Sequence, residues 1–333
     1  MKFSAPILIV GFGSIGKRHT NNLLSQTNSL LIILSKRNDI KDSDFNNYRK
    51  NISRIKIYSN LNDCLQHEPQ VGFITNETSL HVNYALKLAK RGMDLFIEKP
   101  LSNSLTNISL LNSITKKHKK LVMVGCNFRF YPPLMKIKQL VNNHIVGRVI
   151  SVQSENGSYL PDWHPYEDYS KGYAAKKKLG GGVTLTQIHE LDYLIWIFGL
   201  PQKKKSIIGK FSDLNIDADD LSAFIFELKN KILIELHLDY FSKPFYKRLK
   251  IRCSKGIIYW NSYDNKIKIY KNSQNRCSII KIKNNYNLSK QTNQMYIDEI
   301  NYFLNCLIKR KNPMNNLDDA KKTLDALLRL KSK

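Results

Sequence analysis

The sequence has few cysteines and no long apolar run, and both absences narrow the possibilities. Its five cysteines are odd in number, scattered and without C-x-x-C spacing, so no zinc site or redox pair of that pattern is expected and the thiols are predicted to be reduced. The early run PILIVG is much shorter than the core of a signal peptide, and no later run is long enough to span a bilayer. We therefore expect a cytoplasmic protein with no membrane partner and no metal.

Internal repeats and low-complexity tracts are absent as well. A chain of 333 residues is long enough for one large or two medium domains that each bury a core, so neither a disulfide nor a metal is required for stability. Two domains are the expected organisation.

Acidic residues are scarce relative to basic ones: 27 Asp and Glu stand against 53 Lys and Arg, which gives a formal net charge of +26. A basic surface is one requirement for binding nucleic acid. The lysines, however, are spread over both halves of the chain in short runs, such as KKHKK at 116–120 and KKK at 203–205. No nucleic-acid-binding motif accompanies them, so no specific nucleic-acid partner is expected.

The first third of the chain alternates short apolar runs with helical patterns. ILIV at 7–10 has the continuous apolar character of a buried parallel strand, and a helical pattern follows the next six residues, GFGSIG. Further apolar runs lie at 30–34, 71–75, 94–98 and 121–125, and helices are expected over about 79–91 and 104–118. Strands that alternate with helices predict a doubly wound parallel sheet of the Rossmann type.

The pattern changes after about residue 145. Segments 232–240, 248–253 and 266–270 alternate between apolar and polar residues, which is typical of antiparallel strands with one face in water. Helices are expected at about 186–198, 293–309 and 317–330. The sequence therefore predicts an N-terminal Rossmann domain, residues 1–125, and a C-terminal domain, residues 126–333, with a large, mainly antiparallel open sheet flanked by helices.

Gly11, Gly13 and Gly16 form a G-x-G-x-x-G pattern between the first expected strand and helix, a context that predicts a dinucleotide-binding loop. Gly11 would permit the tight turn, Gly13 would let the backbone approach a pyrophosphate, and Gly16 would let the helix pack closely on the strand. The amino terminus of the helix would then hold the anion. The alternative is an ordinary glycine-rich turn.

The apolar run LLIIL at 30–34 is followed by Ser35, Lys36 and Arg37 rather than by a carboxylate. In dinucleotide-binding folds an Asp or Glu about twenty residues past the loop accepts hydrogen bonds from the adenosine 2'-hydroxyl of NAD, whereas a basic residue accommodates the 2'-phosphate of NADP. A hydroxyl and a guanidinium can pair with that phosphate. NADP is therefore the expected cofactor, with NAD as second candidate. In the alternative interpretation, Lys36 and Arg37 only solvate a loop.

FIEKPLS at 96–102 adds a motif that identifies a family. Together with the glycine loop and GGGVTLTQIHELDYLIWIFG at 180–199, it resembles the glucose-fructose oxidoreductase and inositol dehydrogenase family, Gfo/Idh/MocA. The resemblance covers nearly the whole chain and includes TNETSLH at 75–81 and GCNFRFYPP at 125–133. It implies an NAD(P)-dependent oxidoreductase that acts on CH–OH groups of a sugar-like substrate.

By this resemblance Lys99 lies near the nicotinamide and the substrate hydroxyl, and the bond before Pro100 is cis. An ammonium beside a carbonyl oxygen stabilises developing alkoxide charge and can pass a proton. The alternative is a surface lysine before a turn. The candidate cofactor-binding residues are Gly11, Gly13, Ser14, Ile15, Gly16, Ser35, Lys36, Arg37, Thr75, Asn76, His81, Glu98, Lys99 and Pro100.

His189 matches the acid/base histidine of the family, and an imidazole suits the removal of a hydroxyl proton near neutral pH. Asp192 follows three residues later, so on a helix it shares a face with His189 and could orient the ring. A lone histidine on an apolar helix is otherwise structural, but the preceding glycine run, 180–182, suits a close approach of backbone to ligand. Many family members carry an Asp where this chain has Leu185 and Thr186, which leaves the proton route open.

The segment at 159–182, YLPDWHPYEDYSKGYAAKKKLGGG, is dense in aromatic and polar residues. Aromatic rings stack on the apolar faces of sugars while polar groups bond hydroxyls, so the segment suits a sugar or a nucleotide-linked sugar; each residue taken singly is equally well explained as a loop residue. Together with the glycine run and HELDY at 189–193, the segment also resembles proteins of surface-polysaccharide sugar pathways, a weaker resemblance than the one to the family. The candidate substrate-binding residues are Asn127, Arg129, Asp162, Trp163, His164, Tyr173 and His189.

Two further expectations follow. A non-catalytic dinucleotide-binding sensor or assembly protein is the alternative function. The apolar positions Ile232, Ile234, Leu236 and Leu238 must be covered by helices or by another subunit. Because subunits in the resembled family commonly pair sheet to sheet, a homodimer or homotetramer through the C-terminal sheet is expected.

Overall fold

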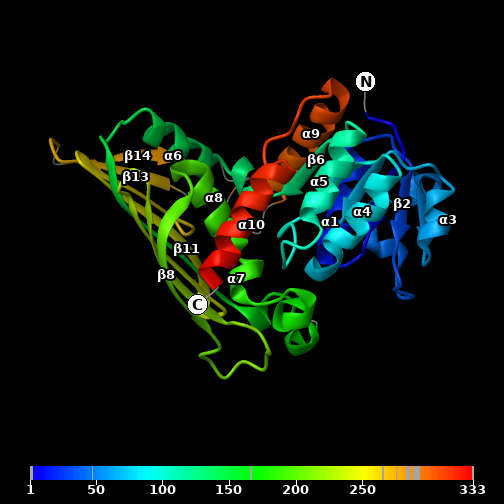
Figure 1. Ribbon diagram of the computed structural model, residues 1–333, viewed down its shortest axis with the longest axis horizontal. Coiled ribbons are helices and arrows are strands. Elements are labelled where there is room, and N and C mark those ends of the chain that lie inside the picture. Colours follow the sequence, from blue (N-terminus) through cyan, green and yellow to red (C-terminus); the bar gives the residue numbers. More distant parts are fainter. Residues whose placement is uncertain are drawn as a thin grey trace. The chain divides into compact units, whose positions relative to one another are not determined.

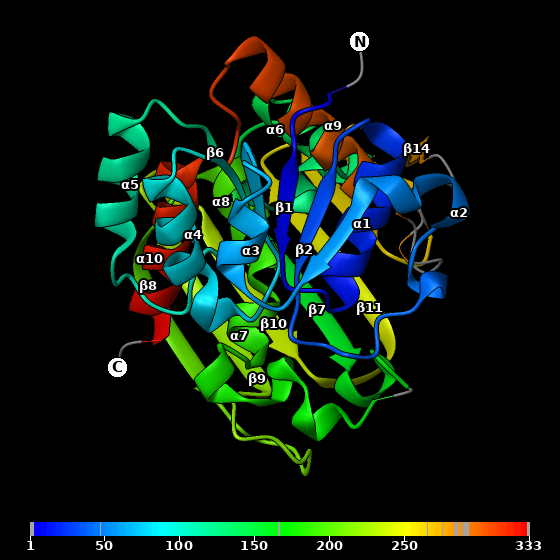
Figure 2. The same ribbon diagram turned by 90° about the vertical axis from the view of Figure 1, so that its right-hand side faces the viewer.

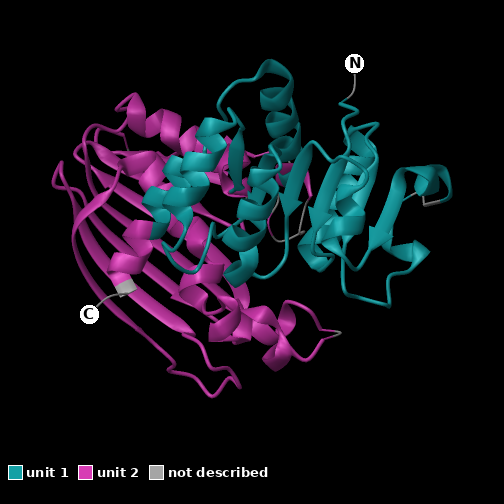
Figure 3. Ribbon diagram, turned by 45° about the vertical axis from the view of Figure 1, so that its right-hand side comes forward, with its two compact units in different colours: residues 1–125, 296–324 teal, residues 126–295, 325–333 magenta. Residues whose placement is uncertain are grey.

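The computed structural model describes residues 3–46, 48–165, 167–264, 266–274, 276–282, 286, 288 and 293–331. The chain forms two units (Figure 3): residues 1–125 with 296–324 make unit 1, and residues 126–295 with 325–333 make unit 2. The prediction assigned all of 126–333 to the second domain, whereas segment 296–324 belongs to unit 1.

Unit 1 contains a six-stranded parallel sheet in the order β3-β2-β1-β4-β5-β6 (Figures 1 and 2). Its strands are β1 (Ile7–Val10), β2 (Leu31–Leu34), β3 (Ile55–Tyr58), β4 (Val71–Ile74), β5 (Asp94–Glu98) and β6 (Val122–Gly125). Its helices are α1 (Ser14–Gln26), α2 (Tyr48–Asn51), α3 (Leu61–Leu65), α4 (His81–Lys90), α5 (Ile108–Lys117) and most of α9 (Gln294–Lys309). The predicted doubly wound parallel sheet is confirmed.

Apolar residues on both faces of this sheet explain why helices cover both. On one face, a Cβ added to Gly72 of β4 would meet Leu88 of α4 at 2.5 Å. On the other, the rings of Phe73 and Phe96 stack at 4.7 Å, and Phe303 of α9 packs against both at 5.9 and 5.6 Å. Each buried Phe contributes about 2–3 kcal/mol, so this cluster accounts for the place of segment 296–324 in unit 1.

Unit 2 contains an eight-stranded sheet in the order β14-β13-β12-β11-β7-β10-β9-β8. The strands are β7 (Val149–Tyr159), β8 (Pro201–Gly209), β9 (Leu221–Leu228), β10 (Leu233–Asp239), β11 (Phe241–Cys253), β12 (Gly256–Asn261), β13 (Lys266–Lys271) and β14 (Ser278–Lys281). The helices are α6 (Pro132–Asn142), α7 (Val183–Thr186) and α8 (Ile188–Phe198), and α10 (Leu317–Lys331) crosses from the range of unit 1 into that of unit 2.

The eight-stranded sheet is mainly antiparallel, as predicted, with one parallel pair between β7 and β10. Ile234, Leu236 and Leu238 of β10 are buried, and α7 and α8 pack on this side of the sheet, so helices of the same chain cover the predicted apolar face. Leu233, the residue before Ile234, points the other way and is exposed, and Glu235 and His237 are half-buried. Among the described residues, no helix combines the length and the apolar character that a membrane crossing requires.

Candidate active site

The glycine loop between β1 and α1 has the geometry that its three glycines predict. Gly11 has φ +95°, and an added Cβ would lie 2.8 Å from the backbone of Asn76. A Cβ on Gly16 would lie 2.3 Å from the carbonyl oxygen of Gly11, so only glycine lets α1 approach β1 this closely. A Cβ on Gly13, in contrast, would meet nothing within 4 Å. The loop is therefore tight at Gly11 and Gly16 and leaves space at Gly13.

This difference gives a paired prediction. Gly16→Ala should destabilise unit 1 because the new methyl group meets backbone, and cofactor affinity should fall with it. Gly13→Ala should leave the free energy of unfolding within about 0.5 kcal/mol yet weaken dinucleotide binding about tenfold, since the methyl group occupies the space left for the pyrophosphate. Thermal unfolding and dinucleotide titration measure both. Equal loss of stability in the two variants would contradict this assignment.

Residues that follow β4 lie against the loop. The Thr75 hydroxyl donates a hydrogen bond of 2.8 Å to the carbonyl oxygen of Gly11. His81 is buried, with Nδ1 2.8 Å from the Pro100 oxygen and Nε2 2.9 Å from the Asn76 oxygen. Burial lowers the pKa of His81 although the two carbonyls raise it. His81 therefore links the end of β4 to the turn after β5, and its effect on the predicted cofactor site is through that link.

Lys99 follows β5 and is held through its backbone. Its N–H donates to a Glu98 carboxylate oxygen at 3.1 Å, and the other Glu98 oxygen lies 2.5 Å from Nε2 of His19 on α1. Burial raises the pKa of Glu98, but the contact with His19 and the ammonium of Lys99 outweigh this and lower it, so the carboxylate is charged. The Lys99–Pro100 bond is cis, as the resemblance implies. The Glu-Lys-Pro segment, residues 98–100, is thus anchored to α1 through the contact of Glu98 with His19.

These residues fit a dinucleotide. The first turn of α1 has no acidic residue and no side-chain cap, and the space beside Gly13 at its start is open. An anion in that space would meet the N–H groups of the helix terminus. The side-chain amide of Asn76 is buried, and neither its nitrogen nor its oxygen has a partner in the described part of the chain. Gly11, Asn76 and Lys99 follow β1, β4 and β5, which are neighbours in a parallel sheet, so they lie along one edge.

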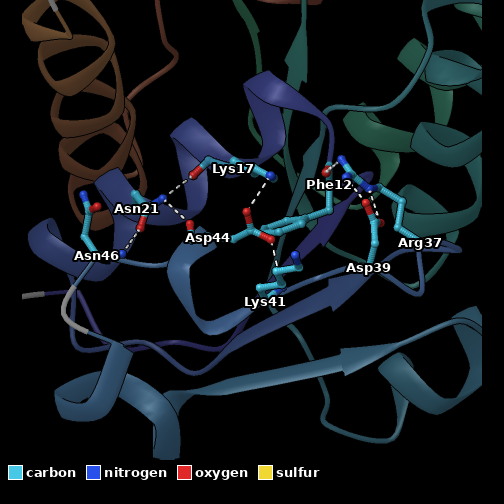
Figure 4. Close-up of polar contacts among 8 residues, drawn as sticks. All are labelled: Phe12, Lys17, Asn21, Arg37, Asp39, Lys41, Asp44 and Asn46. Carbon is cyan, nitrogen blue, oxygen red and sulfur yellow. Dashed lines mark hydrogen bonds and ion pairs between the residues drawn. The ribbon is translucent and has the colours of Figure 1, made fainter. Parts of the chain in front are cut away.

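The segment after β2 is tied to the same loop (Figure 4). Arg37 donates to the Phe12 carbonyl at 3.3 Å. The Arg37 backbone N–H also donates to the Ser35 hydroxyl oxygen at 3.1 Å. Arg37 also forms a two-point pair with Asp39, at 2.9 and 2.7 Å, which lowers the pKa of Asp39 to about 2. Lys36 is exposed. The basic residues predicted at this position are present, together with a carboxylate that the sequence reasoning had not considered.

Unit 2 brings together four of the predicted substrate-side or catalytic residues. His189 lies in the first turn of α8 and contacts the ring of Phe128 at 5.0 Å. Next to Phe128, Arg129 donates two hydrogen bonds of 2.8 Å to the Asp192 carboxylate, and both side chains are buried. Asn127 is buried beside them. Asp192 and Arg129 bind each other, so each can position the other, and their predicted catalytic and substrate contacts stay predictions.

A second buried ion pair lies beside the ring of Phe128. Lys247 of β11 donates to Glu190 of α8, and both side chains are almost completely buried. The Lys247 ammonium also lies over the ring of Phe128, 4.6 Å from its centre. Phe128 is therefore in contact with His189 and with Lys247, and the two ion pairs fix the helix that carries His189 to its neighbours.

The glycine run ahead of His189 approaches protein rather than ligand. A Cβ on Gly181 would lie 2.3 Å from the backbone carbonyl oxygen of Tyr173, and one on Gly182 would lie 2.5 Å from the Asp219 carboxylate. At Gly181 and Gly182 the close approach is therefore to the chain itself, where the sequence predicted an approach to a ligand. Thr186, one of the two positions where the resemblance led us to expect an Asp, bonds through its hydroxyl to the Gly182 carbonyl and to the Tyr240 hydroxyl.

The remaining substrate candidates lie in the segment before the glycine run. Trp163 packs edge-on against the Tyr240 ring at 5.4 Å, so through Tyr240 and Thr186 it is connected to the turn before His189. Asp162 forms an exposed ion pair of 2.8 Å with Lys243. His164 is half-buried and Tyr173 is exposed. Of the predicted substrate residues in this segment, Trp163 is thus linked to the turn before His189, whereas Asp162 and Tyr173 are exposed to solvent.

Sequence reasoning missed several residues that shape these sites. His19 had a readable signal, because it lies four residues before Leu23 on the apolar face of the first helix. Asp39 lies two residues past a segment that was interpreted through its basic residues alone. Lys247 and Glu190 had no signal, since a charged residue in a strand or helix is normally exposed.

Comparisons with known proteins agree with this two-unit arrangement. A model described as the oxidoreductase family with an NAD-binding Rossmann fold matches residues 6–126, and a model of the GFO/IDH/MocA C-terminal domain matches residues 134–259. Myo-inositol 2-dehydrogenase of Thermotoga maritima is 25% identical over 57% of this chain and 54% of its own length. The chain thus spans about half the length of the first curated relatives that it matches.

Two solved structures extend the match to nearly the whole chain at the level of fold. A levoglucosan dehydrogenase in complex with NADH and levoglucosan has a TM-score of 0.83 at 14% identity, over 98% of this chain and 97% of that one. A UDP-N-acetylglucosamine 3-dehydrogenase from Acidithiobacillus ferrooxidans has a TM-score of 0.77 at 15% identity, over 99% and 97% of the two chains.

Proposed function

Because this chain belongs to the GFO/IDH/MocA oxidoreductase family, we propose that it is an NAD(P)-dependent oxidoreductase that interconverts a hydroxyl and a carbonyl group on a sugar. The observation that supports this most strongly is in unit 1. The glycine loop, the unpartnered Asn76 amide and the anchored Lys99 follow three neighbouring strands and share one edge of the sheet. Ligands of doubly wound sheets bind at such an edge.

The chain's own groups handle the proton and the charge. A bound nicotinamide would supply the hydride chemistry. The Lys99 ammonium, with its backbone fixed by Glu98, would stabilise negative charge on the substrate oxygen as its proton leaves. The His189 imidazole would accept that proton in the oxidative direction and return it in the reductive one.

The substrate is proposed to be a sugar, held by the polar and aromatic residues around His189. Asn127 is buried with its side-chain oxygen unpartnered within the described residues, which suits a substrate hydroxyl as donor. Trp163, His164 and Tyr173 supply rings for the apolar faces of the sugar. A nucleotide-linked sugar is the narrower proposal, supported by the likeness in fold to a UDP-N-acetylglucosamine 3-dehydrogenase, and with it a role in surface-polysaccharide synthesis in the cytoplasm.

NADP is the narrower proposal for the cofactor. Ser35, Lys36 and Arg37 follow β2, where the adenosine 2'-position is recognised in this type of fold. No carboxylate occupies the position directly after the strand. The Ser35 hydroxyl uses its oxygen for the Arg37 N–H and so retains its hydrogen for donation to a phosphate.

The function is tested by identifying the nucleotide that copurifies and then measuring absorbance of reduced nicotinamide with panels of sugars and nucleotide sugars, in both directions. We expect at least one sugar to reduce the oxidised dinucleotide, or the corresponding ketone to oxidise the reduced dinucleotide. Dinucleotide binding without any transfer across both panels would favour a sensor, a reading consistent with Thr186 in place of the Asp of many family members.

We further propose that the exposed face of the unit 2 sheet pairs with a second copy of the chain. Ile207, Ile225 and Leu233 expose apolar surface on neighbouring strands β8, β9 and β10. Ile225→Lys should shift the protein to monomer, measured by light scattering after gel filtration. Ile52→Lys is the matched control, because Ile52 in unit 1 has the same exposure of 52%. Equal behaviour of the two variants would contradict pairing through this face.

A further inference from the structure

Asp39 and Arg37 form an exposed pair at the end of β2 (Figure 4). The guanidinium donates from Nε and from a terminal nitrogen to the two carboxylate oxygens, at 2.9 and 2.7 Å. The Arg37 side chain is 40% exposed and the Asp39 side chain 66%. A pair of this kind contributes little to stability, so the fork of Arg37 is available to a stronger anion at small cost.

The surrounding segment is firmly attached to the glycine loop and to α1. Lys17 pairs with Asp44 at 2.6 Å, and Asp44 also accepts from the Lys41 N–H at 2.9 Å. Asn21 donates to the Asp44 carbonyl at 2.9 Å. Phe45 stacks on Phe12 at 5.3 Å. These contacts hold segment 41–46 in place, and none of them involves Asp39. The Asp39 carboxylate accepts its hydrogen bonds from Arg37.

Arg37 has a second anchor that does not depend on Asp39. Its other terminal nitrogen donates to the Phe12 carbonyl, in the glycine loop, at 3.3 Å. If the carboxylate leaves, the guanidinium is still held beside the loop, near Ser35 and Lys36. A carboxylate and a phosphate monoester present the same two-oxygen edge to an arginine. Asp39 thus occupies the position that an incoming phosphate would take.

From this we infer that Asp39 is a residue that sets cofactor specificity: it occupies the anion-binding fork of Arg37, and the 2'-phosphate of NADP must displace it. The inference rests on the proposed dinucleotide-binding function. The displaced carboxylate remains close to a phosphate of nearly two negative charges, and this repulsion lowers NADP affinity. Asp39 therefore holds the preference for NADP below the level that Ser35, Lys36 and Arg37 alone would give, and it leaves NAD affinity unaffected.

The test is a binding experiment on the full chain with NADP, NAD, adenosine 2',5'-bisphosphate and AMP, followed by calorimetry. Asp39→Asn is expected to tighten NADP and the bisphosphate about five- to twentyfold and to change NAD and AMP less than about twofold; the gain should shrink at high salt. Arg37→Ala should weaken NADP selectively. The double variant Arg37→Ala/Asp39→Asn should show no gain.

Asp42→Asn is the matched control, because Asp42 is an exposed carboxylate of the same segment whose removal changes the net charge equally; it should change the NADP to NAD ratio less than about twofold. An unchanged ratio in Asp39→Asn would overturn the inference while leaving the proposed function intact. Weaker NAD binding in that variant would mean that Asp39 accepts the ribose hydroxyls, which also overturns it. Failure of wild type and variant to bind either dinucleotide would overturn the proposed function itself.

Discussion

Replacement of Lys99 by methionine is expected to lower kcat by about 10²–10⁴-fold and to leave dinucleotide affinity within about threefold. The reason is that the ammonium acts on charge that develops during the reaction, whereas the hydrogen bond from the Lys99 backbone N–H to Glu98 remains. Steady-state kinetics with the best substrate of the panel and dinucleotide titration separate the two effects.

Two comparisons sharpen this result. Lys90→Met removes an exposed lysine from the end of α4 and should leave kcat unchanged. Lys99→Arg retains the charge but not an exchangeable proton of similar acidity, so it should recover part of the loss if electrostatic stabilisation dominates. A Lys99→Met variant with wild-type turnover would show that the lysine has no part in the chemistry.

Replacement of Lys247 by methionine is expected to lower the free energy of unfolding of unit 2 by about 3–5 kcal/mol. The variant leaves Glu190 completely buried without the ammonium that it binds. One of its oxygens already has no partner in the described residues. The three tryptophans, Trp163, Trp196 and Trp260, all lie in unit 2, so their fluorescence during urea denaturation reports on this unit.

The control for buried charge is the double variant Glu190→Leu/Lys247→Met, which should recover most of the lost stability because an apolar pair of similar volume replaces the ion pair. Lys203→Met breaks an exposed pair with Glu227, at 3.3 Å, and should cost less than about 1 kcal/mol. A double variant as unstable as Lys247→Met alone would show that loss of the contact between the ammonium and the Phe128 ring, rather than the unpaired carboxylate, lowers the stability.

Much of unit 1 could be predicted because its signals are local. Buried parallel strands such as Ile7–Val10 are continuous apolar runs, and a glycine pattern directly after the first strand specifies both a turn and its neighbours. The strand Ile55–Tyr58 was missed because it lies at the sheet edge, where Lys56 and Ile57 are exposed and the apolar run is broken. The place of α9 was missed because it depends on Phe303 meeting rings that are distant in sequence.

In unit 2 the sequence analysis named segments that match β10, β11 and β13 but not the other strands, among them β7 in the interior of the sheet. Beyond Val152 the inward positions of β7 are Ser154, Asn156 and Ser158, which are buried although polar. Ser154 reaches the hydroxyl of Tyr193 at 2.7 Å, so hydrogen bonds replace the apolar contacts that a periodicity argument relies on. The pairing of Asp192 with Arg129 could not be predicted either, because helical spacing places Asp192 near His189 but does not identify a partner 63 residues away.

The central proposal is that Lys99 and His189 serve the same reaction step, and a kinetic double-variant cycle tests it most directly. Lys99→Met, His189→Asn and the double variant are compared by kcat on the same substrate. Residues that act as a unit are strongly non-additive, so the double variant should be no slower than the slower single variant by more than about threefold. Losses that multiply, or a His189→Asn variant with full turnover, would contradict the claim.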